Sequence, residues 1–434
     1  MVRTINLSIE KMKYYEKIIL LMLSFLIATE GIFVGIKMSI IDIHRFIEII
    51  IFLYFINTII YEINHSKLLR IIFRFQLFLF LLLSLKLFTV TFIYEEISTS
   101  IFWDMARLFL MFMLFYLIFI YLKYMKNGLR IILLFNFPIM LIAFMQFNLF
   151  PFSDFAWDFK NTYFANNSVD LAMSNDADTQ TAFRTRVIGL YGFSIPLAYI
   201  LSVNMIMTAY LYLKSNNFIY ILYLVFLGVI SIFTLTRSIL LSWFVIMSYI
   251  LFKFFKNTKF STKVVSFIIL LIFSIFAVNQ FTSNSSSFNR LSGVEDASAA
   301  GRIPLALTGT YAMVSYPFGV SKNAYDDIKK EMFQIYHQTN ILNFTSHNGI
   351  IQFGLTYTLI GFFVLAYFLM NIFRILRDTL DKEMYIFMLV AFFTYLVNAL
   401  FHNNFIFVED YYSMIILALL VYEYDLNTKN RGLL

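Results

Sequence analysis

The sequence has no cysteine, only five histidines and little charge. Without cysteine, neither disulfides nor thiolate metal sites are available. The histidines are scattered, with no H-x-x-H or H-E-x-x-H spacing, so we expect no zinc held by the protein and no cofactor. Charged residues make up 14% of the chain, whereas a soluble domain has about 25%. The scarcity of charge argues against a soluble protein.

Hydrophobic residues are abundant instead, at 60% of the 434 residues. A soluble protein of this length cannot bury that much Phe, Ile and Leu, so the excess must face lipid. The formal net charge of +7 would be compatible with nucleic-acid binding, but the positions of the charged residues argue against it. Most lie in short loops that alternate along the chain, which is a signal of membrane topology. We therefore expect the lipid bilayer, and no nucleic acid, as a partner.

Runs of about 20 apolar residues predict membrane-spanning helices. Twelve such spans are predicted, near 18–36, 45–62, 68–92, 101–122, 129–150, 194–213, 218–235, 238–255, 263–281, 349–371, 384–401 and 405–423. The fold class is thus all-α: a polytopic transmembrane helix bundle of about 12 spans. We see no internal repeat and treat residues 1–434 as a single transmembrane domain.

The distribution of basic residues predicts the orientation of the bundle. The N-terminus is basic, and it leads into an apolar run with no small-residue cleavage site, so we expect an uncleaved first span. Every second loop is also basic and falls on the side of the N-terminus. By the positive-inside rule, that side is cytoplasmic. We therefore expect a multi-pass membrane protein with both termini on the cytoplasmic side.

Two of the predicted outer loops are long, residues 151–193 and residues 282–348. Long loops in compact proteins usually carry function. We expect both to be partly helical. In the second loop, Ser321 or Asn323 is a suitable N-cap for a helix that runs to about His337.

Three short motifs on the predicted outer side of the membrane contain side chains suited to catalysis or to phosphate binding. They are Thr236-Arg237-Ser238, Gly301-Arg302-Ile303-Pro304 and Ser346-His347-Asn348-Gly349. Each has a plain structural reading when taken alone. An arginine near the membrane surface often reaches lipid phosphates, an arginine on a loop helix is often simply solvated, and a single interfacial histidine is often structural. Arg186, before the sixth span, has the same alternative reading.

Together, arginines and a histidine on one face suit an anionic, lipid-linked substrate. Guanidinium groups bind phosphate oxygens through two hydrogen bonds and keep their charge. A sugar on a polyprenyl diphosphate already has a good leaving group, so the diphosphate needs charge stabilisation more than protonation. The attacking sugar hydroxyl gains nucleophilicity when a histidine removes its proton. Such a set needs no metal.

The order of these motifs resembles the bacterial O-antigen ligase and O-antigen polymerase family. The resemblance rests on Thr-Arg-Ser at an outer hairpin, Gly-Arg before Tyr316-Pro317-Phe318-Gly319, and His-Asn-Gly-Ile-Ile-x-x-Gly at the start of a span. It is clearest from about 184 to 371, and the first five spans are similar only in hydropathy. The family often has a larger residue where this chain has Gly349.

The resemblance implies a membrane glycosyltransferase that uses undecaprenyl-diphosphate-linked glycans outside the cytoplasmic membrane. Its catalytic residues would be Arg237 and Arg302, which bind diphosphate, and His347, the base that activates the acceptor hydroxyl. Further substrate-binding residues are expected at Arg186, Arg290, Asn348, Ser238 and His402.

We predict a polysaccharide polymerase of O-antigen or capsule type, which joins lipid-linked repeat units. A chain-length regulator and a flippase of the same pathway are its expected partners. The nearest alternative is a ligase that moves finished polysaccharide onto lipid A–core. A transporter, such as a lipid-linked oligosaccharide flippase, is the alternative from another class. Transporters rely on helices interrupted by glycine and proline, and this chain has 14 Gly and 5 Pro, which argues against that class.

Overall fold

A computed structural model gives the fold of most of the chain. The residues that it describes are 14–30, 32, 37–38, 41–96, 98–147, 150–164, 187–191, 194–234, 236–257, 302–337, 340–343, 345–408 and 410–431.

The predicted all-α class is confirmed. Within the described residues, eight helices are long and apolar enough to cross a membrane. They are α2 (Ile43–His65), α3 (Lys67–Phe92), α4 (Thr99–Tyr124), α5 (Gly128–Met145), α9 (Ser194–Ser215), α11 (Arg237–Asn257), α18 (Gly349–Thr379) and α19 (Lys382–Ala399). The chain is therefore a multi-pass membrane protein.

Three more predicted spans coincide with helices that are shorter or more polar. These are α1 (Tyr14–Ala28), α10 (Ile219–Phe233) and α20 (Ser413–Asn430). The predicted span near 263–281 lies outside the described residues, so the total of about twelve remains a prediction. Helix α20 begins later than predicted because Phe405 and Val408 exchange backbone hydrogen bonds of 2.9 and 2.8 Å in a tight turn.

The remaining elements lie between the spans. They are the hairpin strands β1 (Lys37–Met38) and β2 (Ile41–Asp42), and the helices α6 (Ser153–Tyr163), α15 (Arg302–Ser315), α16 (Lys322–Tyr336) and α17 (Asn340–Asn343). Helix α16 has the predicted limits. The side chain of Ser321 accepts a hydrogen bond from the Ala324 amide at 3.1 Å, which caps the first turn. His337 ends the helix in the left-handed conformation, with φ of 52°.

The centre of the bundle is formed by α9, which is buried along nearly its whole length. Helix α9 packs against α10, α11 and α19, while α4 packs against α20. The outer helices leave large apolar side chains uncovered, among them Leu53, Leu81 and Phe88. Such side chains suit contact with lipid rather than water. The hydrophobic excess of the sequence is thus divided between the core and this outer surface.

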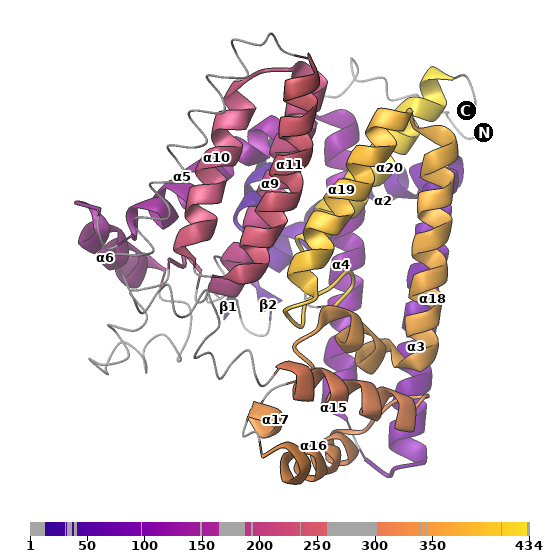
Figure 1. Cartoon of the computed structure of the whole chain (residues 1–434). Helices are drawn as coiled ribbons and strands as arrows, with labels where there is room; N and C mark the ends of the chain where they lie inside the picture. Colours follow the sequence, from indigo (N-terminus) through magenta and orange to yellow (C-terminus); the bar gives the residue numbers. More distant parts are fainter. Residues whose placement is uncertain are drawn as a thin grey trace.

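Helix α18 bends part-way along its length (Figure 1), at Tyr357 and Thr358, which have non-helical backbone angles. A break of this kind interrupts the helical hydrogen bonds and leaves carbonyls that need donors. The buried ammonium of Lys86, on α3, donates to the carbonyls of Leu355 and Thr356 at 2.8 and 3.2 Å. A lysine from a neighbouring helix therefore stabilises the bend.

The helices α15, α16 and α17 gather at one end of the bundle, opposite the C-terminal end of α20 (Figure 1). The N-terminal ends of α11, α18 and α20 lie at this same end. The described parts of the three motifs lie in or beside these segments, so the fold brings the described members of the predicted site to one end of the molecule.

Candidate active site

Arg302 and His347 come from two segments that pack tightly together. Arg302 is the first residue of α15, and His347 lies two residues before α18. The two helices are in contact. At Gly309 the approach is so close that an added Cβ atom would lie 2.8 Å from Cβ of Ser346. A glycine at this position therefore allows α15 to lie against the segment that carries the histidine.

His347 is half-buried, and its backbone is in the left-handed region, with φ of 46°. This conformation is uncommon for a residue with a side chain. Burial lowers the pKa of the imidazole below its usual 6.5, and the positive charge of Arg302 lowers it further. His347 is therefore mainly neutral near pH 7, which is the form that accepts a proton.

His402 lies beside this pair, in the turn after α19. It is buried, and its pKa falls to about 3, first because of burial and then because of the charges of Arg302 and His347. Ser238 donates its only hydroxyl proton to Asn398 Oδ1 at 2.7 Å and lies 3.1 Å from His402 Nε2. The hydroxyl of Ser238 therefore links the side chains of Asn398 and His402. His402 thus holds α11 against the end of α19, and its Nε2 is engaged in this contact.

Asn348 and Gly349 fix the start of α18. The side chain of Asn348 accepts hydrogen bonds from the amides of Ile350 and Ile351 at 3.0 and 3.1 Å, and thereby caps the helix. Its Nδ2 donates to the carbonyl of Leu400 at 3.3 Å. A Cβ on Gly349 would lie 2.5 Å from the carbonyl oxygen of Asn404. The glycine therefore permits α18 to begin directly against the 400–404 turn.

The same turn also holds the arginine. The guanidinium of Arg302 lies over the ring of Phe401, 5.6 Å from its centroid, a distance at which a cation and an aromatic face attract each other. Tyr199 donates from its hydroxyl to the carbonyl of Asn404 at 2.8 Å. The turn is thus anchored to α9 on one side and contacts Arg302 on the other.

A cavity of about 320 Å³, lined by both apolar and charged side chains, opens beside the first part of α18. Its lining includes Gln352 of α18, whose Oε1 accepts from the hydroxyl of Ser346 at 3.3 Å, next to His347. The basic residues Lys86, Arg107 and Lys322 and the acidic residue Asp104 also line it. Basic side chains thus outnumber acidic ones in the lining of the cavity, and Arg107 lies 3.8 Å from Asp104.

The fold brings together five of the eight predicted site residues: Arg302, His347, His402, Ser238 and Asn348. Arg237 begins α11 directly before Ser238 and is half-buried. Arg186 and Arg290 lie outside the described residues, so their roles remain predictions.

The sequence interpretation missed two residues of this region, Asn398 and Phe401. Asn398 binds Ser238, and Phe401 lies under Arg302. One signal was present: Asn398 and His402 stand four residues apart at the end of an apolar span, where two polar groups need partners. Phe401 gave no signal among 54 phenylalanines.

Residues 222–369 match the family model described as O-antigen ligase. This part of the chain is similar to that family. The resemblance seen in the motifs is thus confirmed, and the match includes Arg237, Arg302 and His347, whereas Asn398 and His402 lie beyond it. Neither the curated proteins nor the solved structures give a match to the chain. The family indicates, in general terms, a membrane enzyme that transfers glycans.

Proposed function

We propose that this protein is a polysaccharide polymerase of the bacterial cytoplasmic membrane. It would transfer a glycan from undecaprenyl diphosphate to a sugar hydroxyl of another lipid-linked repeat unit. The family match gives the reaction class, and the pairing of Arg302 with His347 is the observation that carries the proposal. A permanent cation beside a neutral imidazole provides the two functions that such a transfer needs.

In this mechanism the bond from the anomeric carbon of the donor sugar to the diphosphate oxygen breaks as the acceptor oxygen bonds to that carbon. His347 takes the proton of the acceptor hydroxyl, which makes the oxygen a better nucleophile. Arg302 and Arg237 stabilise the negative charge that the leaving diphosphate gains. Undecaprenyl diphosphate leaves as the anion, and the proton later returns from His347 to water. No step requires a metal or a cofactor.

The site would face the outside of the membrane. Basic side chains collect at the other ends of the helices, as at Lys123, Lys126, Arg130, Arg374 and Arg377. By the positive-inside rule those ends are cytoplasmic. The outer position suits a reaction that consumes glycans already moved across the membrane, and a flippase and a chain-length regulator of the same pathway would be its partners.

Polymerisation is supported by the basic cavity beside α18. Both substrates of a polymerase carry a lipid diphosphate, so the enzyme needs two cationic binding sites. Arg302 would bind the diphosphate of the donor, and the basic residues of the cavity would bind that of the acceptor. Transfer to lipid A–core is the second candidate, because the matching family is described by its ligase activity.

The two reactions are separated by incubating the purified protein with lipid-linked repeat units, with and without lipid A–core. A ladder of products in the absence of lipid A–core supports the polymerase. Product that forms only with lipid A–core contradicts it and supports the ligase. The matched variants are His347→Ala and His65→Ala, since His65 is exposed at the opposite end of the bundle. Equal activity of both variants contradicts the proposed site.

A further inference from the structure

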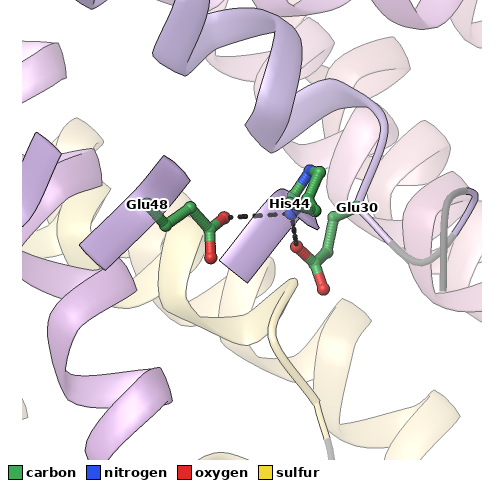
Figure 2. Close-up of side chains that lie close together, drawn as sticks. All are labelled: Glu30, His44 and Glu48. Atoms are coloured by element: carbon green, nitrogen blue, oxygen red, sulfur yellow. Dashed lines mark ion pairs between the residues drawn. The ribbon is translucent and has the colours of Figure 1, made fainter. Parts of the chain in front are cut away.

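Three side chains that the proposed reaction does not use converge between the first two helices. Glu30 follows α1, and His44 and Glu48 lie one turn apart at the start of α2. Figure 2 shows the imidazole between the two carboxylates. His44 Nδ1 is 3.6 Å from Glu30 Oε2 and 3.4 Å from Glu48 Oε1. One ligand atom from each residue lies within 4.8 Å of the others.

The protonation of His44 is constrained by its other ring nitrogen. Nε2 lies 2.9 Å from the carbonyl oxygen of Leu26, which only accepts hydrogen bonds, so Nε2 carries a proton. In the neutral ring, Nδ1 then has a lone pair that points toward two carboxylate oxygens. A histidine that donates one nitrogen to a backbone carbonyl and directs the other at carboxylates has the orientation common among metal ligands.

The two carboxylate oxygens that face His44 have no hydrogen-bond partner among the described residues. Both side chains are buried: Glu48 is 0% and Glu30 is 4% exposed. The other oxygen of each carboxylate is bound by Arg45, at 2.7 Å in the case of Glu48. A buried carboxylate oxygen without a partner is costly. Three electron-pair donors, His44 Nδ1 and one oxygen each of Glu30 and Glu48, thus face one point.

We propose that Glu30, His44 and Glu48 bind a divalent ion of the zinc class. Bonds of about 2.1 Å in a tetrahedral site place neighbouring ligand atoms about 3.4 Å apart, close to the two distances from Nδ1. A proton on Nδ1 fits less well. A charge-assisted N–H···O bond is about 2.7–2.9 Å long, and one proton cannot serve both oxygens. One imidazole nitrogen with two carboxylates is a ligand set that zinc accepts.

The surrounding charges allow such an ion. Glu30 and Glu48 oppose the single charge of Arg45, and Asp410 adds a further carboxylate that interacts electrostatically with Glu30. The two carboxylates and the one guanidinium carry a formal charge of −1, so a divalent cation would meet net negative charge at this point.

The ion would have a structural role. The hydroxyl of Tyr412 donates to the backbone carbonyl of Glu30, and Arg45 lies over the ring of Tyr411, 3.9 Å from its centroid. The cluster therefore ties the connection between α1 and α2 to the residues just before α20. The ion would hold these segments together and take no part in the transfer reaction.

The test measures bound metal on the full-length protein in detergent. Wild-type protein is stripped with EDTA, incubated with Zn²⁺ or Mn²⁺ alone, desalted and analysed by mass spectrometry of the elements. We expect about one Zn²⁺ per chain, and His44→Gln and Glu48→Gln should lower bound zinc at least about tenfold. The matched control is Glu62→Gln, which removes a different buried carboxylate, paired with Lys123. This variant should keep its zinc.

A second measurement does not depend on any variant. Co²⁺ bound to wild-type protein should give the intense visible absorption of a tetrahedral N/O site, and excess Zn²⁺ should remove it. Wild-type protein that retains no metal after desalting overturns the proposal, as does zinc binding that His44→Gln leaves unchanged. Equal loss of zinc in Glu62→Gln also overturns it, because the loss would then follow from general destabilisation.

Discussion

His347 and Arg302 are linked electrostatically: burial lowers the pKa of the His347 imidazole below 6.5, and the positive charge of Arg302 lowers it further. The same charge also acts on His402. One arginine, at least 45 residues away in the sequence, thus adds to the effect of burial on both histidines. The lowered pKa keeps the proposed base neutral near pH 7. Arg302 thus has two proposed functions, lowering the pKa of His347 and binding the diphosphate, and the two can be tested separately.

The first prediction concerns the pH dependence of Arg302 variants. A base acts in its neutral form, so activity should rise with pH through the pKa of His347, with a midpoint below 6.5 in the wild type. Arg302→Gln removes a charge that lowers this pKa, so the midpoint should move upward. Arg302→Lys keeps the charge and should leave the midpoint in place, yet it should lower turnover because the planar two-hydrogen-bond contact with phosphate is lost. The measurement is kcat/KM against pH for the three proteins.

A midpoint that does not change in Arg302→Gln contradicts the electrostatic link between the two residues. Full activity of Arg302→Lys contradicts the two-hydrogen-bond contact with the diphosphate.

The second prediction separates the two histidines. His347→Ala should lower turnover by a factor on the order of 10²–10⁴ and leave donor binding nearly intact, because it removes a general base. His402→Ala should retain turnover but lower the free energy of unfolding by about 1–3 kcal/mol, because it removes a buried hydrogen bond between α11 and the end of α19. Turnover and thermal unfolding are measured on both variants. An inactive, well-folded His402→Ala beside an active His347→Ala means that the base has been assigned to the wrong residue.

Local chemistry explains why some elements were predictable from the sequence. The limits of α16 follow from Ser321 as the N-cap and His337 at the other end, and both signals lie within the helix and its neighbours. The spans follow from hydropathy in the same way. Signals of this kind need no knowledge of what packs against the segment.

Contacts between distant segments account for what the sequence did not predict. Nothing in the sequence around Tyr357 and Thr358 predicted the bend of α18, where Lys86, on α3, binds the freed carbonyls. The spacing of His44 and Glu48 was visible, but Glu30 joins them only through the fold. Sequence patterns report neighbours along a helix, whereas these sites depend on neighbours across the bundle.

The third prediction concerns the packing of Gly349. Gly349→Ala should lower both stability and activity, because its Cβ would meet the backbone oxygens of Asn404 and Ala399 at 2.5 and 3.0 Å. Backbone atoms cannot rotate away, so α18 and the 400–404 turn must separate. Overpacking of this kind costs about 1–3 kcal/mol. Gly128→Ala is the control, since its Cβ would meet only the side chain of Tyr121, at 2.9 Å. Thermal unfolding and turnover should be affected less in Gly128→Ala than in Gly349→Ala.

The fourth prediction uses the absence of cysteine to test orientation. Single cysteines replace Lys330, on α16, and Arg377, near the end of α18; both side chains are exposed. In intact cells with a permeable outer envelope, a membrane-impermeant maleimide should label Lys330→Cys. It should label Arg377→Cys only after the cytoplasmic membrane is opened. The reverse pattern would place the candidate active site in the cytoplasm, and the proposed use of exported lipid-linked glycans would then be wrong.

The last prediction separates the proposed metal site from the proposed reaction. The transfer mechanism uses only arginine and histidine side chains, so turnover at 25 °C should persist in excess EDTA. The Glu30, His44 and Glu48 cluster should lose its ion under the same treatment, and the melting temperature should fall because the link between the α1–α2 connection and the start of α20 is weakened. Turnover and thermal unfolding are therefore measured on the same chelated sample, with Glu48→Gln as the reference for a protein without the ion.

Two outcomes of this experiment would contradict the proposals. Loss of turnover that Mg²⁺ or Mn²⁺ restores, at a temperature where the protein stays folded, would mean that carboxylates bind a catalytic metal. The metal-independent mechanism would then have to be abandoned. An unchanged melting temperature with full turnover would leave the mechanism standing and would contradict the structural role of the ion.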